Sequence, residues 1–130
     1  MDFPKILIVD DETHTRSTIR EHFSKRIECE ILEAGNGYEA LEKVKANNID
    51  IILLDIKMPG ISGIEVMEKI RESLKDLPII VLSKFESEEI NNKIKSFGAE
   101  FINKPFSLKI VREKVEEILK SRSKFFPKQV

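Results

Sequence analysis

This sequence has little of what membrane-spanning, secreted and nucleic-acid-binding proteins usually require. Its single cysteine, Cys29, cannot form an internal disulfide, which is typical of a reducing compartment. No stretch approaches the ~18 consecutive apolar residues of a membrane span, and the first apolar run is too short and too soon acidic for a signal peptide. With 22 basic and 23 acidic residues the net charge is −1, so no overall attraction to nucleic acid or anionic membrane is expected. We therefore expect a cytoplasmic protein that binds neither directly.

The chain also lacks internal repeats and any linker that would divide it into domains. Its 130 residues are the length of one ordinary domain, which buries roughly two-thirds of the surface of the unfolded chain. Short apolar runs, typical of strands buried on both faces, alternate along it with segments of helical period. The runs are Lys5–Val9, Glu30–Ala34, Ile49–Leu54, Ile79–Leu82 and Phe101–Ile102.

A helix is expected after each of these strands. The first covers about Glu12 to Arg26, and the second closes near Asn47. Ser62, Ser87 and Ser107 are N-cap candidates for the last three, with Glu65 completing a capping box and Gly98 at the C′ position of the fourth. The third helix is expected to bury Ile64, Met67, Ile70 and Leu74.

Five strands alternating with five helices predict an α/β fold, a parallel sheet with helices on both faces. Right-handed crossovers leave few topologies for such a sheet. We expect the domain to span residues 3–121. The basic segment 122–130, which holds Phe125, Phe126 and Pro127 without helical spacing, is then a frayed tail or linker stub; the alternative is a docking segment for a partner or a second copy.

Polar residues follow four of the predicted strands. Asp10 and Asp11 follow the first, Asp55 the third, Ser83 the fourth and Lys104 the fifth. In an open parallel sheet, ligands bind in the crevice outside the carboxyl ends of the strands. The sequence therefore predicts one site containing three carboxylates, a hydroxyl and an ammonium.

The three acids predict a divalent cation. Two carboxylates ~4 Å apart repel by about 4 kcal/mol at an effective dielectric near 20, so the group needs compensation. Oxygen ligands favour Mg²⁺ or Mn²⁺ over zinc. The alternative is that each Asp caps the next helix, which explains one Asp per strand end but not the Asp10-Asp11 pair together with Asp55.

Lys104 and Ser83 suit the other half of such a site. Pro105 restricts Lys104 to an extended conformation, and the lysine ends a strand, where it would balance the acids. The Ser83 hydroxyl can donate to a phosphoryl oxygen. Serines are common in turns, so Ser83 gains weight only in combination with the other residues.

Several motifs together resemble the receiver domain of response regulators in two-component signal transduction (CheY-like). They are VDDE (Val9–Glu12), AGNGYEAL (Ala34–Leu41), LDIKMPG (Leu54–Gly60), VLS (Val81–Ser83), SFGAEF (Ser96–Phe101) and NKPF (Asn103–Phe106). The resemblance covers roughly residues 3–120. It implies the flavodoxin-like doubly wound sheet of five parallel strands in the order 2-1-3-4-5.

The resemblance also implies a role for each matching residue. Asp55 would accept a phosphoryl group from the histidine of a sensor kinase or phosphotransfer protein, assisted by Lys104 and Ser83. Mg²⁺, for which Mn²⁺ can substitute, would be bound by Asp11, Asp55 and the backbone carbonyl of Lys57, with Asp10 acting largely through water. Such phosphoryl transfer requires in-line positioning and neutralisation of charge.

The same resemblance implies a switch. Ser83 would move toward the new charge and the aromatic ring of Phe101 would fill the vacated space, changing the surface of the fourth helix, fifth strand and fifth helix. Family members more often have Thr at the position of Ser83 and Tyr or His at that of Phe101, so a hydrogen-bonded readout through Phe101 is not expected. The changed surface would control a downstream protein or an output domain, and a phosphorylation-dependent dimer is one form of that output.

Three rival functions are less consistent with these residues. A phosphatase of the haloacid dehalogenase type usually has a second acid two residues after the nucleophile, where this chain has Lys57. An FMN-binding flavodoxin would place its phosphate beside Asp10 and Asp11, which would repel it. A receiver that no longer accepts phosphate would not be expected to keep every reactive position. The chain is then either a stand-alone receiver or a receiver excised from a longer regulator.

Overall fold

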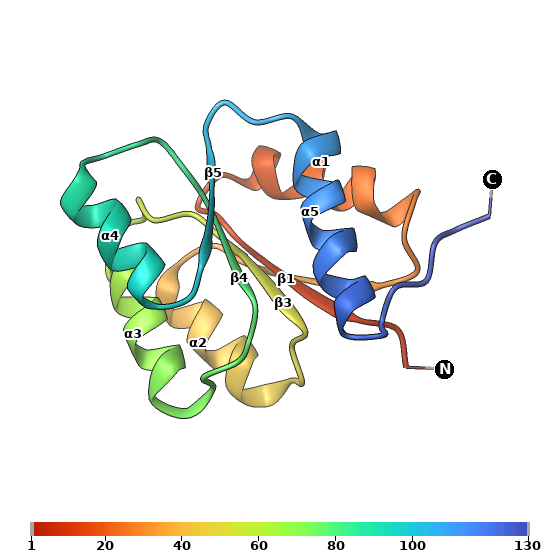
Figure 1. Cartoon of the computed structure of the whole chain (residues 1–130), viewed down its shortest axis with the longest axis horizontal. Coiled ribbons are helices and arrows are strands. Elements are labelled where there is room, and N and C mark those ends of the chain that lie inside the picture. Colours follow the sequence, from red (N-terminus) through yellow and green to blue (C-terminus); the bar gives the residue numbers. More distant parts are fainter. Residues whose placement is uncertain (1, 130) are drawn as a thin grey trace.

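The computed structural model describes residues 2–129 and shows strands and helices in strict alternation (Figure 1). The strands are β1 (Lys5–Val9), β2 (Glu30–Ala34), β3 (Ile51–Leu54), β4 (Ile79–Ser83) and β5 (Glu100–Asn103). The helices are α1 (Thr13–Ser24), α2 (Gly37–Ala46), α3 (Gly63–Ser73), α4 (Glu88–Ser96) and α5 (Leu108–Ser121). None of the helices in this part of the chain is long and apolar enough to span a membrane.

The five strands form one parallel sheet in the order β2-β1-β3-β4-β5. This confirms the predicted flavodoxin-like topology. The strand order reverses between β1 and β3: the chain first moves outward to β2, then returns past β1 to build the other half. The carboxyl ends of β1 and β3 therefore meet at the switch point, where such folds bind their ligands.

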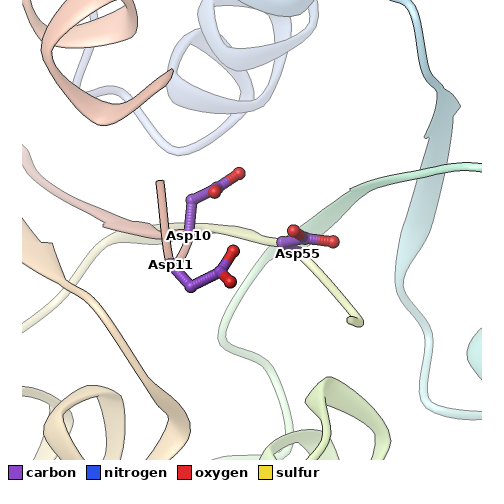
Figure 2. Close-up of side chains that lie close together, drawn as sticks. All are labelled: Asp10, Asp11 and Asp55. Carbon is purple, nitrogen blue, oxygen red and sulfur yellow. The ribbon is translucent and has the colours of Figure 1, made fainter. Parts of the chain in front are cut away.

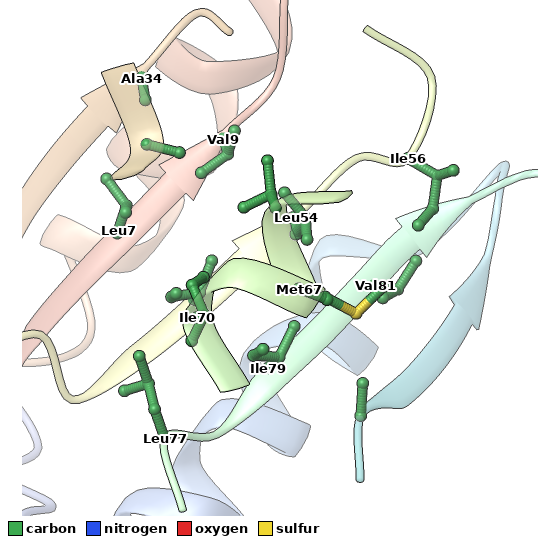
Figure 3. Packing of buried hydrophobic residues seen from close by; sticks show 14 of the residues in the cluster. Leu7, Val9, Ala34, Leu54, Ile56, Met67, Ile70, Leu77, Ile79 and Val81 are labelled. Carbon is green, nitrogen blue, oxygen red and sulfur yellow. The ribbon is translucent and has the colours of Figure 1, made fainter. Parts of the chain in front are cut away.

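Helices cover both faces of the sheet, as predicted (Figure 1). On one face, α1 and α5 bury residues that include Phe23 and Val115 against alternate side chains of the strands. On the other face, α2, α3 and α4 form the second core, and Figure 3 shows Met67 and Ile70 of α3 among side chains of β3 and β4. Because β1, β3 and β4 are buried on both sides, their sequences are almost continuously apolar, whereas the edge strands β2 and β5 also contain polar residues.

Most helix starts follow the chemistry expected of them. Ser62, Ser87 and Ser107 each accept a hydrogen bond from the backbone N–H three residues later, and Asn36 does the same for α2. Gly98 has a φ of +73°, as a C′ residue requires. These local signals fix where the loops leave the carboxyl edge of the sheet.

Two expectations about packing were wrong. Leu74 is 41% exposed because α3 ends at Ser73, while Val66, absent from the predicted face, is fully buried. Residues 122–129 are not frayed: Ile27 forms an antiparallel bridge with Pro127, Phe125 packs against the α1–α5 core and Lys124 pairs with Asp50 at 3.0 Å. The tail thus covers the end of the sheet opposite the carboxyl edge.

Gly63, the first residue of α3, lies directly against the chain after β3. A Cβ there would lie 2.8 Å from the Asp55 carbonyl oxygen and 2.8 Å from the Ile56 Cα, both backbone atoms that cannot rotate away. We predict that Gly63→Ala lowers the free energy of unfolding by about 1–3 kcal/mol, a usual result of overpacking. Urea denaturation measures this. Gly35→Ala is the matched control, since its Cβ would meet only side-chain ends at 3.4 Å; equal losses for both variants would contradict the prediction.

Candidate functional site

The polar residues singled out in the sequence all lie at the carboxyl edge of the sheet. Asp10 and Asp11 follow β1, Asp55 follows β3, Ser83 ends β4 and Lys104 follows β5. Two backbone hydrogen bonds carry the sheet up to these residues: the Asp55 N–H donates to the Val9 carbonyl at 3.0 Å and the Lys104 N–H donates to the Ser83 carbonyl at 3.0 Å. The backbone pairing of the strands therefore fixes the positions of the five side chains relative to one another along the strand direction.

The three aspartates form one acidic cluster (Figure 2). One carboxylate oxygen from each lies within 4.8 Å of those of the others. Asp10 and Asp55 are buried, with 4% and 7% of their surface exposed, whereas Asp11 is exposed. One oxygen of each buried acid is held by a backbone N–H two residues on, from Glu12 to Asp10 at 2.9 Å and from Lys57 to Asp55 at 3.2 Å.

Lys104 provides the cation of the site. Its Nζ lies 3.4 Å from an oxygen of Asp10 and 3.4 Å from an oxygen of Asp55. Burial alone would lower the pKa of Lys104, but the charges of Asp55 and Asp10 outweigh it and raise that pKa. Lys104 is therefore charged at neutral pH and bridges two acids that would otherwise repel each other.

The environment of Asp55 disfavours the ionised form of its carboxyl group. Its pKa is raised, mainly by burial and further by Asp10, against the opposing attraction of Lys104. One ammonium does not fully compensate three carboxylates. The cluster therefore favours a further cation.

The donor set fits a hard divalent ion. Within residues 2–129, these aspartates are the one group of three or more His, Cys, Asp or Glu side chains close enough together to share a metal. The ligands are carboxylate oxygens, and Asp11 faces solvent, so water can complete the coordination. Oxygen ligands with room for water suit Mg²⁺ or Mn²⁺.

Ser83 and Phe101 lie on the same face of the sheet. Phe101 of β5 pairs with Val81 of β4, and Ser83 is two residues beyond Val81. Since side chains alternate along a strand, Val81, Ser83 and Phe101 point to one side. Ser83 is only 2% exposed, while Phe101 is half-buried against the core under α2, α3 and α4.

The side chains that hold the backbone of the site in place were not predicted from the sequence. Arg16 of α1 donates to the Asp10 carbonyl at 2.6 Å and to Glu33 of β2 at 3.0 Å. Burial would raise the pKa of Glu33, but hydrogen bonds from Arg20 and Arg16 lower it. An acid in a strand, opposite two arginines four residues apart on a helix, is the signal that could have indicated this network.

Two contacts between loops were also missed. Lys57, after β3, pairs with Glu86, after β4, at 2.9 Å between Nζ and Oε1. The side chain of Asn103 accepts a hydrogen bond from the Phe85 N–H at 2.8 Å. Both contacts connect segments that are distant in sequence, so no local sequence pattern predicts them.

The comparison with protein families decides what this arrangement belongs to. The model of the response regulator receiver domain matches residues 6–116. The chain belongs to this family. The receiver domain named by the motifs is thereby confirmed. The match begins within β1 and ends within α5, so it includes all or part of every strand and helix.

Relatives of this receiver domain include both short and long proteins. It is 43% identical to the transcriptional regulatory protein ResD of Bacillus subtilis, over 92% of this chain but 49% of ResD. It is 32% identical to the sporulation initiation phosphotransferase F of the same organism, over 92% of this chain and 96% of that protein. The chain thus spans about half of ResD, and 31% of a cyclic di-GMP phosphodiesterase of Thermotoga maritima that is 35% identical to it.

Solved structures agree with the fold. The receiver domain superposes with a TM-score of 0.79 on the response regulator TrrA of Thermotoga maritima, which was solved in complex with Mg²⁺-BeF; the two are 39% identical, over 90% of this chain and 100% of TrrA. The CheY-like receiver of Methanospirillum hungatei gives a TM-score of 0.86 at 28% identity, over 95% and 98% of the two chains.

Proposed function

We propose that this receiver domain accepts a phosphoryl group on Asp55 from the phosphohistidine of a sensor kinase or phosphotransfer protein. The observation that carries the proposal is the position of Asp55, buried at the switch point beside two further acids and 3.4 Å from the Lys104 ammonium. A carboxylate oxygen of Asp55 forms the new bond to phosphorus as the bond to the histidine nitrogen breaks. The histidine leaves with the electron pair of that bond.

The metal of this proposal is Mg²⁺, with Mn²⁺ as a substitute. Asp11 and Asp55 would hold it directly, the Lys57 backbone carbonyl would be a third protein ligand, and Asp10 would act largely through water. When bound, the ion supplies positive charge to the phosphoryl oxygens. Its binding also offsets the repulsion within the acidic cluster.

The chain's own residues supply the rest of the chemistry. The Lys104 ammonium, already between the two buried acids, neutralises charge on the transferring group. The Ser83 hydroxyl donates to another phosphoryl oxygen. The hydrogen bond from the Lys57 N–H holds one Asp55 oxygen in place, which orients the other as the nucleophile.

The output of this reaction would be a change of surface. The phosphoryl group replaces one negative charge with about two. Ser83 moves toward it and Phe101, on the same face of the sheet, follows into the vacated space. The α4–β5–α5 surface then controls a partner protein, an output domain of a longer regulator, or a phosphorylation-dependent dimer.

The same proposal covers the remaining properties of the chain. Residues 3–121 form the receiver, with 122–130 as an appended segment. The domain catalyses only its own phosphorylation and slow dephosphorylation and does so in the cytoplasm. Near-neutral charge supports an output by protein contact rather than by binding nucleic acid.

Labelling by a small phosphodonor tests the proposal. Incubation with acetyl phosphate and Mg²⁺ should raise the intact mass by about 80 Da, the mass of one PO₃H unit. The same incubation with EDTA should leave the mass unchanged, and Mn²⁺ added in excess should restore labelling. Labelling that is equal with and without a divalent ion would contradict the metal-dependent site.

A further inference from the structure

The geometry points to Asn103 as a positioning residue for the phosphoryl site: its side chain holds the loop between β4 and α4 so that Ser83 and Lys104 keep their places. This inference rests on the proposed function. It assigns a role to a residue that contacts neither the acidic cluster nor the transferring group.

The contact is a hydrogen bond that replaces a rung of the sheet. The ladder between β4 and β5 ends with the Lys104 N–H donating to the Ser83 carbonyl at 3.0 Å. In a regular parallel ladder, the next bond would run from the Phe85 N–H to the Lys104 carbonyl. Here the Phe85 N–H donates instead to Oδ1 of Asn103, at 2.8 Å. A side chain thus extends the pairing by one step after the strands have separated.

This hydrogen bond lies next to the two residues that would contact the phosphoryl group. Phe85 is two residues after Ser83, and Asn103 directly precedes Lys104. The bond therefore joins the two chain segments that carry the hydroxyl and the ammonium of the site, just beyond their last shared backbone bond. Holding these segments together fixes the separation of the two groups meant for different oxygens of one phosphoryl group.

Little else restrains this loop. Residues 84–87 have no regular secondary structure, and the Phe85 side chain is 56% exposed, so packing does not hold it. The Lys57–Glu86 ion pair attaches the loop on its other side, toward β3, and Ser87 caps α4. The Asn103 bond is the attachment toward β5.

Losing that attachment should slow phosphorylation without preventing metal binding. Small misplacements of groups that stabilise the transition state lower the rate, and one neutral hydrogen bond corresponds to a factor of about three to ten. Asn103→Leu, similar in size but without an acceptor, should therefore reduce the rate constant of labelling about three- to tenfold. The affinity for Mg²⁺ should not change, because the acidic cluster is anchored elsewhere.

The experiment measures single-turnover labelling at saturating acetyl phosphate and Mg²⁺, together with hydrogen exchange of the Phe85 amide. Asn103→Asp keeps the acceptor and should retain both a near-wild-type rate constant and a protected amide. Asn103→Leu should lose both while reaching the wild-type labelled fraction, since a purely structural defect would lower that fraction instead. Asn47→Leu is the matched control: its side-chain amide donates to the Lys43 carbonyl at the end of α2.

The outcomes separate this inference from the function on which it rests. If the wild type is labelled and Asn103→Leu is labelled at the same rate, the role of Asn103 alone is overturned. Equal slowing in Asn103→Leu and Asn103→Asp also overturns it, because the acceptor would then be irrelevant. Wild type that takes no label overturns the proposed function and this inference with it.

Discussion

Asp55→Asn should take up no phosphoryl group from acetyl phosphate, even at saturating Mg²⁺. The amide lacks the anionic oxygen that would attack phosphorus, and the other acids of the cluster do not occupy its buried position: Asp10 keeps one oxygen on the Glu12 N–H and Asp11 is exposed. Intact mass spectrometry measures the result. Labelling of this variant at more than a small percentage of the wild-type rate would place the phosphoryl group elsewhere.

The same variant should be more stable than the wild type when no metal is present. Burial and Asp10 raise the pKa of Asp55 above its ordinary 3.8. The protonated carboxyl therefore stabilises the folded state, and this contribution to stability is lost as the pH rises through the pKa of the folded protein. At pH 7 in EDTA, the free energy of unfolding of Asp55→Asn should exceed that of the wild type by about 1–2 kcal/mol. This is part of the roughly 4 kcal/mol repulsion between two carboxylates 4 Å apart. Below pH 3.8 the gain should disappear.

Asp50→Asn is the matched control for both measurements. Asp50 lies just before β3, at the opposite end from Asp55, where it accepts from the Lys5 N–H at 2.8 Å and pairs with Lys124 at 3.0 Å. Its replacement should leave labelling unchanged and lower the free energy of unfolding, because an ion pair is lost. A metal-free Asp55→Asn less stable than the wild type would contradict the account of the crowded acids.

Lys104→Met should slow labelling by a factor on the order of 10², the usual result of removing one group that stabilises charge in a transition state. The methionine keeps most of the side-chain volume but removes the ammonium that lies 3.4 Å from both Asp10 and Asp55. Mg²⁺ should bind at least as tightly as in the wild type, because the cluster is then more negative. Rates of labelling at saturating Mg²⁺ and a calorimetric Mg²⁺ titration measure the two effects.

Lys84→Met provides the comparison for Lys104. Lys84 directly follows β4 and is exposed, so its loss removes the same charge from the same edge of the sheet without touching the acids. Its labelling rate should stay within about twofold of the wild type, as expected of a screened surface charge. Equal effects of the two substitutions would show that general charge, rather than the placed ammonium, matters.

The fold could be predicted from the sequence because its signals are local and agree with one another. Continuous apolar runs mark the buried strands, and Ser62, Ser87 and Ser107 mark helix starts by a bond only three residues away. The parallel sheet then brings the polar residues after β1, β3, β4 and β5 to one edge. That part of the site follows from topology alone.

What could not be predicted depends on contacts between distant segments. The Lys57–Glu86 pair and the Asn103 hydrogen bond each join residues 18 or more positions apart through polar side chains that a sequence presents as ordinary surface. The tail was misjudged for the same reason. Phe125 has no helical period, yet tertiary contacts order the segment that carries it.

Locating the phosphoryl group within the wild-type chain tests the central claim most directly. After labelling with acetyl phosphate and Mg²⁺, borohydride reduction converts an aspartyl phosphate to homoserine, and peptide mapping identifies the altered residue. The acidic pocket at the β1–β3 switch point predicts homoserine at position 55 and at no other aspartate. Modification at another residue, or an unaltered Asp55 in protein that has gained the phosphoryl mass, would contradict it.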